Sequence, residues 1–146
     1  MSWLSKIIEA ISPLINYFAK RHRKSREVIN EIYIDFCKIQ KMIIDLRKEV
    51  AKTTMDNVNI KEAQYKCKDL FQKVNNEIEK IKQYSAENKL YLTKSKVKNI
   101  DKCISLTISS LNLLSLDAEK SKGLNRDTME VTDELFKEIE KLKPKY

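Results

Sequence analysis

An apolar stripe with a period of 3.5 residues runs through the first third of the chain. It constrains the fold more than any other feature. The stripe alternates steps of three and four residues without a slip, and twelve of its fourteen positions are apolar. This spacing places the side chains on one face of an α-helix. The stripe consists of Leu4, Ile8, Ile11, Ile15, Phe18, His22, Ser25, Ile29, Ile32, Phe36, Ile39, Ile43, Leu46 and Val50.

Two places in this stripe are candidate breaks. Ser12 and Pro13 fit an N-cap followed by proline at the first helical position, but Pro13 can also kink a continuous helix. The two polar stripe positions lie in a basic run at residues 20–26. The preserved register favours one long helix of roughly 70 Å. We expect residues 1–19 to form an N-terminal amphipathic helix and residues 20–146 to form one helical bundle domain.

Three further apolar stripes with helical spacing follow, within residues 60–84, 97–118 and 129–142. Short polar segments separate them, and such turns make neighbouring helices antiparallel. A single glycine and two prolines exclude a many-stranded β-fold or a glycine-rich phosphate loop. The sequence therefore predicts an all-α protein. Its expected architecture is an antiparallel four-helix bundle with long, coiled-coil-like helices and an extra N-terminal amphipathic helix.

Local signals mark where these helices begin and end. Asn59, followed by Glu62, resembles a capping box, and Thr93 is a predicted N-cap. The only glycine, Gly123, follows two lysines, which is typical of the residue just beyond a helix C-terminus. Asp127 begins a second capping-box pattern for the last helix.

The chain lacks the residue combinations of common catalytic and metal sites. One histidine and three scattered cysteines do not make a zinc site. His22 lies among cations and is interpreted as a surface residue. Cys37, Cys67 and Cys103 lie on or beside apolar stripes and are interpreted as reduced, buried thiols. We expect no enzymatic activity, no catalytic residues, no metal and no cofactor.

The N-terminal segment is the strongest candidate for function. Eight apolar side chains share one broad helical face, and five cations follow it directly, a pattern typical of helices that lie at a membrane interface. The same face also fits packing into the bundle or against a second copy. The candidate membrane- or partner-binding residues are Trp3, Leu4, Ile7, Ile8, Ile11, Leu14, Ile15, Phe18, Lys20, Arg21, Arg23, Lys24 and Arg26.

Nucleic acid is a weaker candidate partner, although the net charge is +8. Nucleic-acid surfaces usually combine arginines with exposed aromatic residues or a reading helix. Outside residues 20–26 the chain has only Arg47 and Arg126. Lys94, Lys96 and Lys98 occupy alternate positions, so they spread around their helix.

The first twenty residues resemble membrane-active amphipathic peptides, such as leaderless bacteriocins and staphylococcal modulins, in composition. The opening Met1-Ser2-Trp3-Leu4-Ser5-Lys6-Ile7-Ile8 carries this resemblance, which implies membrane affinity. The remainder is similar in size, basicity and helix count to bacteriocin immunity proteins, which are antiparallel four-helix bundles on the cytoplasmic side of the membrane. No motif of that family matches residue by residue, so the resemblance assigns no family.

We therefore expect a small, basic, non-enzymatic bundle that docks to an anionic membrane surface or to another helical protein. The expected location is the cytoplasm, on the inner face of the membrane, and the expected role is that of a bacterial or phage immunity or defence factor. The alternative is a module that self-associates into homo-oligomers through a coiled-coil-type seam. The Lys-, Ile- and Asn-rich composition suggests an AT-rich coding genome.

Overall fold

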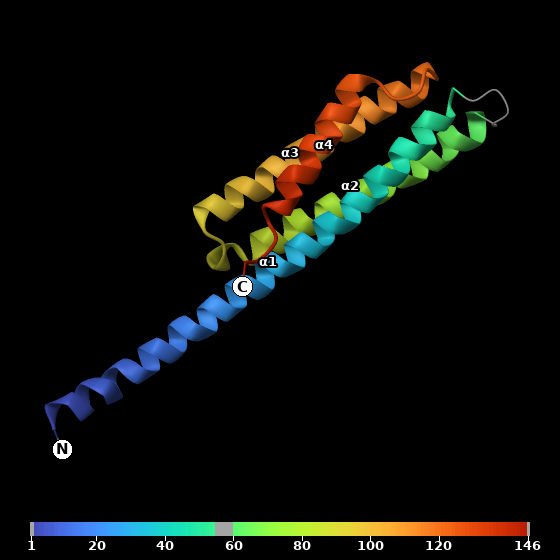
Figure 1. Ribbon diagram of the computed structural model, residues 1–146. Coiled ribbons are helices and arrows are strands. Elements are labelled where there is room, and N and C mark those ends of the chain that lie inside the picture. The colour runs from blue at the N-terminus through green and yellow to red at the C-terminus, as the bar shows by residue number, and fades with distance from the viewer. Residues whose placement is uncertain (1, 55–59, 146) are drawn as a thin grey trace.

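A computed structural model describes residues 2–54 and 60–145. All regular structure in these residues is helical, which confirms the predicted all-α class. The elements are the α-helices α1 (Trp3–Lys52), α2 (Ile60–Glu87), α3 (Lys94–Lys120) and α4 (Arg126–Glu140), with a short 3-10 helix, η1 (Lys89–Tyr91), between α2 and α3 (Figure 1). Asn59, the predicted cap of the second helix, lies outside the described residues.

Helix α1 is continuous over 50 residues, through both candidate breaks. Ser2 is its N-cap, and the Ser2 hydroxyl accepts a hydrogen bond from the Ser5 amide at 3.4 Å. Pro13 lies inside the helix, where it has no N–H to donate to the Glu9 carbonyl. Residues 3–19 are thus the first part of a longer helix, as the unbroken register favoured.

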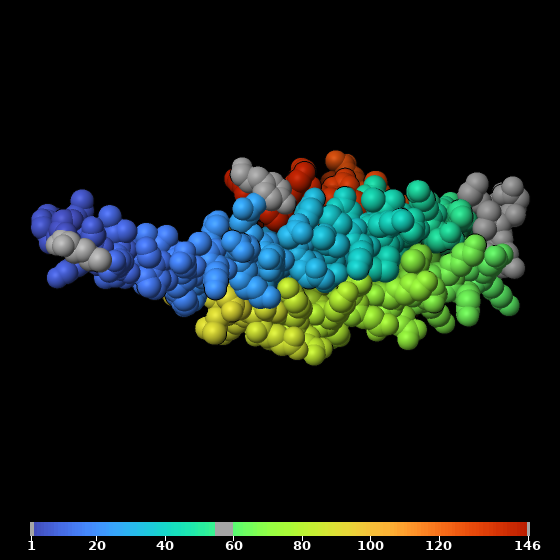
Figure 2. All heavy atoms as spheres, turned by 90° about the horizontal axis from the view of Figure 1, so that it is seen from below, coloured from blue at the N-terminus to red at the C-terminus, as the bar shows by residue number. Residues whose placement is uncertain are grey.

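Only the second part of α1 belongs to the packed core. The buried apolar side chains begin at Val28, beside the stripe, and then follow the stripe from Ile32 to Val50. Every large apolar side chain from Trp3 to Phe18 is exposed instead. Figures 1 and 2 show this part of α1 extending beyond the rest of the molecule. We call residues 3–19 the projecting segment.

The remaining helices cover the buried part of α1. Helix α2 returns along α1, and α3 and α4 lie side by side as a second pair (Figure 1). All four helices contribute to one core. Its largest fully buried side chains are Phe36, Ile32, Ile39, Ile43, Leu46, Ile81, Leu114, Leu135, Ile139, Leu142, Val28 and Val50.

The helix ends match the sequence signals in part. Thr93 caps α3, and its hydroxyl accepts a hydrogen bond from the Lys96 amide at 3.2 Å, as predicted. The placement of Gly123 directly after α3 is wrong, because Ser121 takes the left-handed conformation there, with φ 53°. Gly123 also has positive φ, 79°, but lies further along the turn. The capping box at Asp127 is wrong as well, since the N-cap of α4 is Asn125.

Two buried carboxylates at the edge of the core join neighbouring helices through lysines. Asp35 on α1 lies 3.4 Å from the ammonium of Lys80 on α2. Glu138 on α4 lies 3.1 Å from Lys102 on α3 and 2.8 Å from Lys141. The hydrogen bond from Lys141 lowers the pKa of Glu138, although burial opposes this shift. The stabilisation from Glu138 is therefore lost as the pH falls through its lowered pKa.

The two parts of α1 should differ sharply in what they contribute to stability. We expect Ile39→Ala, in the core, to lower the free energy of unfolding by about 2–5 kcal/mol. The matched variant Ile11→Ala, in the projecting segment, should change it by less than about 0.5 kcal/mol. Urea unfolding followed by circular dichroism measures both values. Equal losses would show that the projecting segment is packed.

Candidate functional site

The projecting segment presents one apolar face along its whole length. We call this the apolar face; its members are Trp3, Leu4, Ile7, Ile8, Ile11, Leu14, Ile15 and Phe18. Their exposed fractions range from 42% at Ile7 and Ile11 to 73% at Trp3. Lys6, Glu9 and Asn16 occupy the opposite side of the helix at helical spacing. All eight apolar residues predicted from the sequence are thus brought together on one exposed surface.

The five predicted cations follow on the next two turns of α1; we call Lys20, Arg21, Arg23, Lys24 and Arg26 the basic cluster. The guanidinium of Arg21 donates a hydrogen bond to the carbonyl oxygen of Leu90 at 2.8 Å. The ammonium of Lys24 lies 5.9 Å from the centre of the Tyr91 ring. Two members of the basic cluster therefore also hold η1 against α1.

Two other members line a small surface hollow beside the C-terminal end of the chain. Arg23 and Arg26 share this hollow, of about 340 Å³, with His22, Glu27 and Pro144. His22 lies on the surface of α1, as interpreted from the sequence. Cations and one carboxylate line the hollow, which is open to solvent and is part of the charged surface.

A second group of lysines belongs to the segment that contacts the basic cluster, and no local sequence pattern predicts this proximity. Residues 89–98 contain Lys89, Lys94, Lys96 and Lys98 and no acidic residue. The hydrogen bond between Arg21 and Leu90 joins two segments that are 69 residues apart in sequence. Residues 20–26 carry a charge of +5 and residues 89–98 carry +4, while the net charge of the chain is +8. The rest of the chain therefore has a net charge of −1.

We call these nine cations the cationic end: the basic cluster together with Lys89, Lys94, Lys96 and Lys98. Lysines at alternate positions point in different directions around their helix, so the spacing at 94–98 alone does not predict a cationic surface. Tertiary contacts between α1 and η1 bring this segment to the basic cluster. No local periodicity in the sequence signals such a contact.

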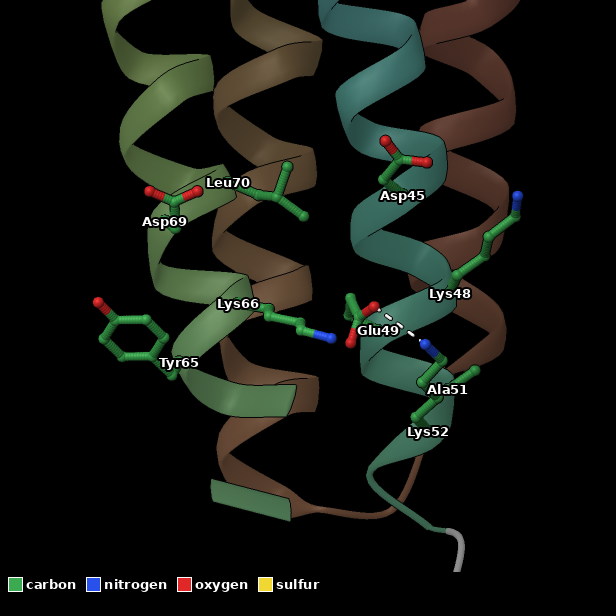
Figure 3. Close-up of a pocket in the computed structure, with 9 residues that line it drawn as sticks. All are labelled: Asp45, Lys48, Glu49, Ala51, Lys52, Tyr65, Lys66, Asp69 and Leu70. Carbon is green, nitrogen blue, oxygen red and sulfur yellow. Dashed lines mark hydrogen bonds and ion pairs between the residues drawn. The ribbon is translucent and has the colours of Figure 1, made fainter. Parts of the chain in front are cut away.

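Another hollow, of about 620 Å³, lies between α1 and α2 at the end of the bundle opposite η1. Its charged groups alternate in sign, and Glu49 lies 3.1 Å from Lys52. Figure 3 shows Lys66 extending toward Glu49, whereas Tyr65 points away from the groove. These side chains form a solvated, charge-paired surface, and none of the predicted site residues is among them.

The thiols and carboxylates form no metal site in the part of the chain that the structure describes: no three His, Cys, Asp or Glu side chains come together there. Cys67 and Cys103 are buried, and Cys37 is half-buried. Burial raises the pKa of Cys67 to about 11 and that of Cys103 to about 12. Both thiols are therefore protonated near neutral pH and lack nucleophilic character.

No known family model matches the chain, and neither does any curated protein or solved structure. Across residues 2–54 and 60–145, no helix has a stretch that is both long enough and apolar enough to cross a membrane.

The buried thiols should resist modification until the protein unfolds. In the native protein at about pH 8, we expect iodoacetamide to leave Cys67 and Cys103 unmodified, because both are protonated and shielded. In guanidinium chloride both should react. Peptide mass spectrometry after each treatment locates the modified residues. Rapid native modification of Cys103 would contradict its placement in the core.

Proposed function

We propose that this protein is a small, non-enzymatic, antiparallel four-helix bundle that attaches to anionic membrane surfaces through its apolar face and basic cluster. The observation that carries the proposal is the exposure of the whole apolar face. Large contiguous apolar patches on a soluble protein mark sites of interaction with proteins or membranes. The amphipathic projecting segment is the element that makes the attachment.

The hydrophobic contribution comes from side chains that the bundle leaves exposed. Full burial of a Val, Leu, Ile or Phe side chain is worth about 1.5–3 kcal/mol. The eight members of the apolar face are each between two-fifths and three-quarters exposed. Their transfer into the boundary between headgroups and acyl chains therefore supplies enough free energy for reversible binding. Trp3, at the far end, is a residue type that favours this boundary.

The electrostatic contribution comes from the basic cluster directly behind this face. Each Lys or Arg near an anionic bilayer is worth about 1 kcal/mol. The cytoplasmic leaflet carries the anionic lipids, which supports attachment at the inner face of the membrane. Similarity in size and basicity to bacteriocin immunity proteins supports an immunity or defence role in a bacterium or phage.

Membrane attachment should depend on the apolar face and on low salt. We expect the protein to float with phosphatidylglycerol-containing vesicles, and expect flotation to fall as salt is added, because salt screens the basic cluster. Ile11→Asp should abolish flotation, since it places a charge in the apolar face. Density-gradient flotation at several salt concentrations measures this.

The chain offers a close control for that variant. Ile34 lies on the solvent side of the same helix and has the same exposed fraction as Ile11, 42%. Ile34→Asp should therefore float like the wild type. Absence of wild-type flotation at low salt, or equal loss in both variants, would contradict membrane attachment through the apolar face.

A second candidate function, self-association, is supported by the continuous register of α1. The stripe that packs in the core from Ile32 onward continues into the apolar face without a slip in register. A helix from a second copy would extend the core packing along this stripe. In this arrangement the projecting segments of two copies cover each other.

This second function predicts a dimer or larger species without lipid. Light scattering coupled to size exclusion, at rising protein concentration, should then give a mass above that of the monomer, 17.2 kDa. Ile11→Asp should restore the monomer, whereas Ile34→Asp should not. A wild-type monomer at every concentration would contradict self-association.

A further inference from the structure

We propose that the cationic end is a second contact surface for the same anionic bilayer, with Leu90 as its inserted side chain. In this mode α1 is inclined to the membrane, and Trp3 lies deepest. The inference rests on the proposed membrane attachment and extends it to residues on η1 and α3. Its ligands are lipids with anionic headgroups, and its new contact residues are Leu90, Lys89 and Lys94.

Leu90 is exposed without a packing role of its own. It is 79% exposed, more than any other large hydrophobic residue that the structure describes. Its neighbours Tyr91 and Leu92 pack against the core. The hydrogen bonds from Tyr91 N to Asn88 O, 3.0 Å, and from Leu92 N to Lys89 O, 3.2 Å, fix the turn. A rigid turn therefore holds one leucine side chain out into solvent.

The charge around Leu90 matches an anionic surface. The fold places four lysines of one segment beside the basic cluster of another, while the remaining chain is almost neutral. Like charges brought together weaken the folded state but concentrate anions at the surface. An exposed apolar side chain surrounded by cations is the arrangement that binds anionic lipid at an interface.

The position of η1 determines how α1 meets the membrane. Arg21, which binds the Leu90 carbonyl, follows Phe18 by three residues and Leu14 by seven. All three lie along one side of the helix, whereas Lys24, which contacts Tyr91, lies about 60° further round. Helix η1 therefore stands beside the edge of the apolar face that contains Leu14 and Trp3. Helix η1 stands out from α1, so a flat bilayer that touches both η1 and the far end of the apolar face is inclined to the axis of α1. Trp3, 18 residues from Arg21 and roughly 27 Å along the axis, then lies deepest.

The first experiment measures partition of the full chain into phosphatidylglycerol–phosphatidylcholine vesicles. We expect Leu90→Ser to lower the partition coefficient about tenfold, and Lys89→Gln and Lys94→Gln to lower it several-fold each. Leu116→Ser, at a leucine that is 49% exposed on α3, is the apolar control. Lys122→Gln, in the turn after α3, is the charge control. Both controls should bind like the wild type, with unchanged thermal unfolding in all variants.

The second experiment measures depth with the single tryptophan of the chain. Lipids brominated deep in the acyl chain should quench Trp3 in the wild type more strongly than the tryptophan of the Trp3→Phe/Phe18→Trp double variant. Equal quenching at both positions would overturn the inclined orientation. A helix that lies parallel to the membrane has positions 3 and 18 at the same depth and gives equal quenching.

The two proposals fail in different ways. If wild-type protein does not bind vesicles, membrane attachment is wrong and this inference falls with it. Binding by the wild type but not by Ile11→Asp supports membrane attachment. If Leu90→Ser then has the same partition coefficient as Leu116→Ser, the second contact surface is overturned. A loss confined to Leu90→Ser, Lys89→Gln and Lys94→Gln supports the cationic end as a membrane contact.

Discussion

Burial of the α1 stripe from Ile32 to Val50 holds the four helices together. This buried stretch is shorter than α1, so the remainder of the helix stays exposed. Helix α1 has 50 residues, or about 75 Å, whereas α2 and α3 have 28 and 27 residues, or about 40 Å each. Such partners cover only part of α1. The same apolar pattern therefore forms a core at one end of the helix and an exposed surface at the other.

Charge is also distributed unevenly, with paired charges along α2 and an excess of cations at the cationic end. Along α2 many lysines lie beside a carboxylate on the same helix, as Lys66 does beside Glu62 and Lys73 beside Asp69. Exposed ion pairs of this kind contribute little to stability, and they keep the net charge of the α2 surface low. At the cationic end, contacts with η1 instead hold the Arg- and Lys-rich residues 20–26 against the Lys-rich residues 89–98. The positive net charge of the protein is thus a property of one end of the bundle.

The sequence predicted those features that depend on local periodicity. The helical class, the Thr93 cap and the shared face of Trp3 to Phe18 all follow from spacing within one segment. Features that depend on tertiary contact could not be predicted. The carboxylate of Asp117 accepts hydrogen bonds from the Thr128 hydroxyl, 2.6 Å, and the Asn125 amide, 3.0 Å, which fixes the start of α4 two residues before the predicted cap. The contact between Arg21 and Leu90 is equally non-local.

Continuity of α1 through Pro13 also changes the thermodynamics of the projecting segment. A free helix of this length is marginal in water, because forming its first turn is unfavourable. Here the first turns already exist in the core, so residues 3–19 extend an established helix and need no nucleus of their own. Unlike a free amphipathic peptide, which folds as it binds, this segment is already helical in the unbound protein. In the proposed membrane attachment it gives up little conformational entropy, so more of the free energy from burying its apolar surface is retained as affinity.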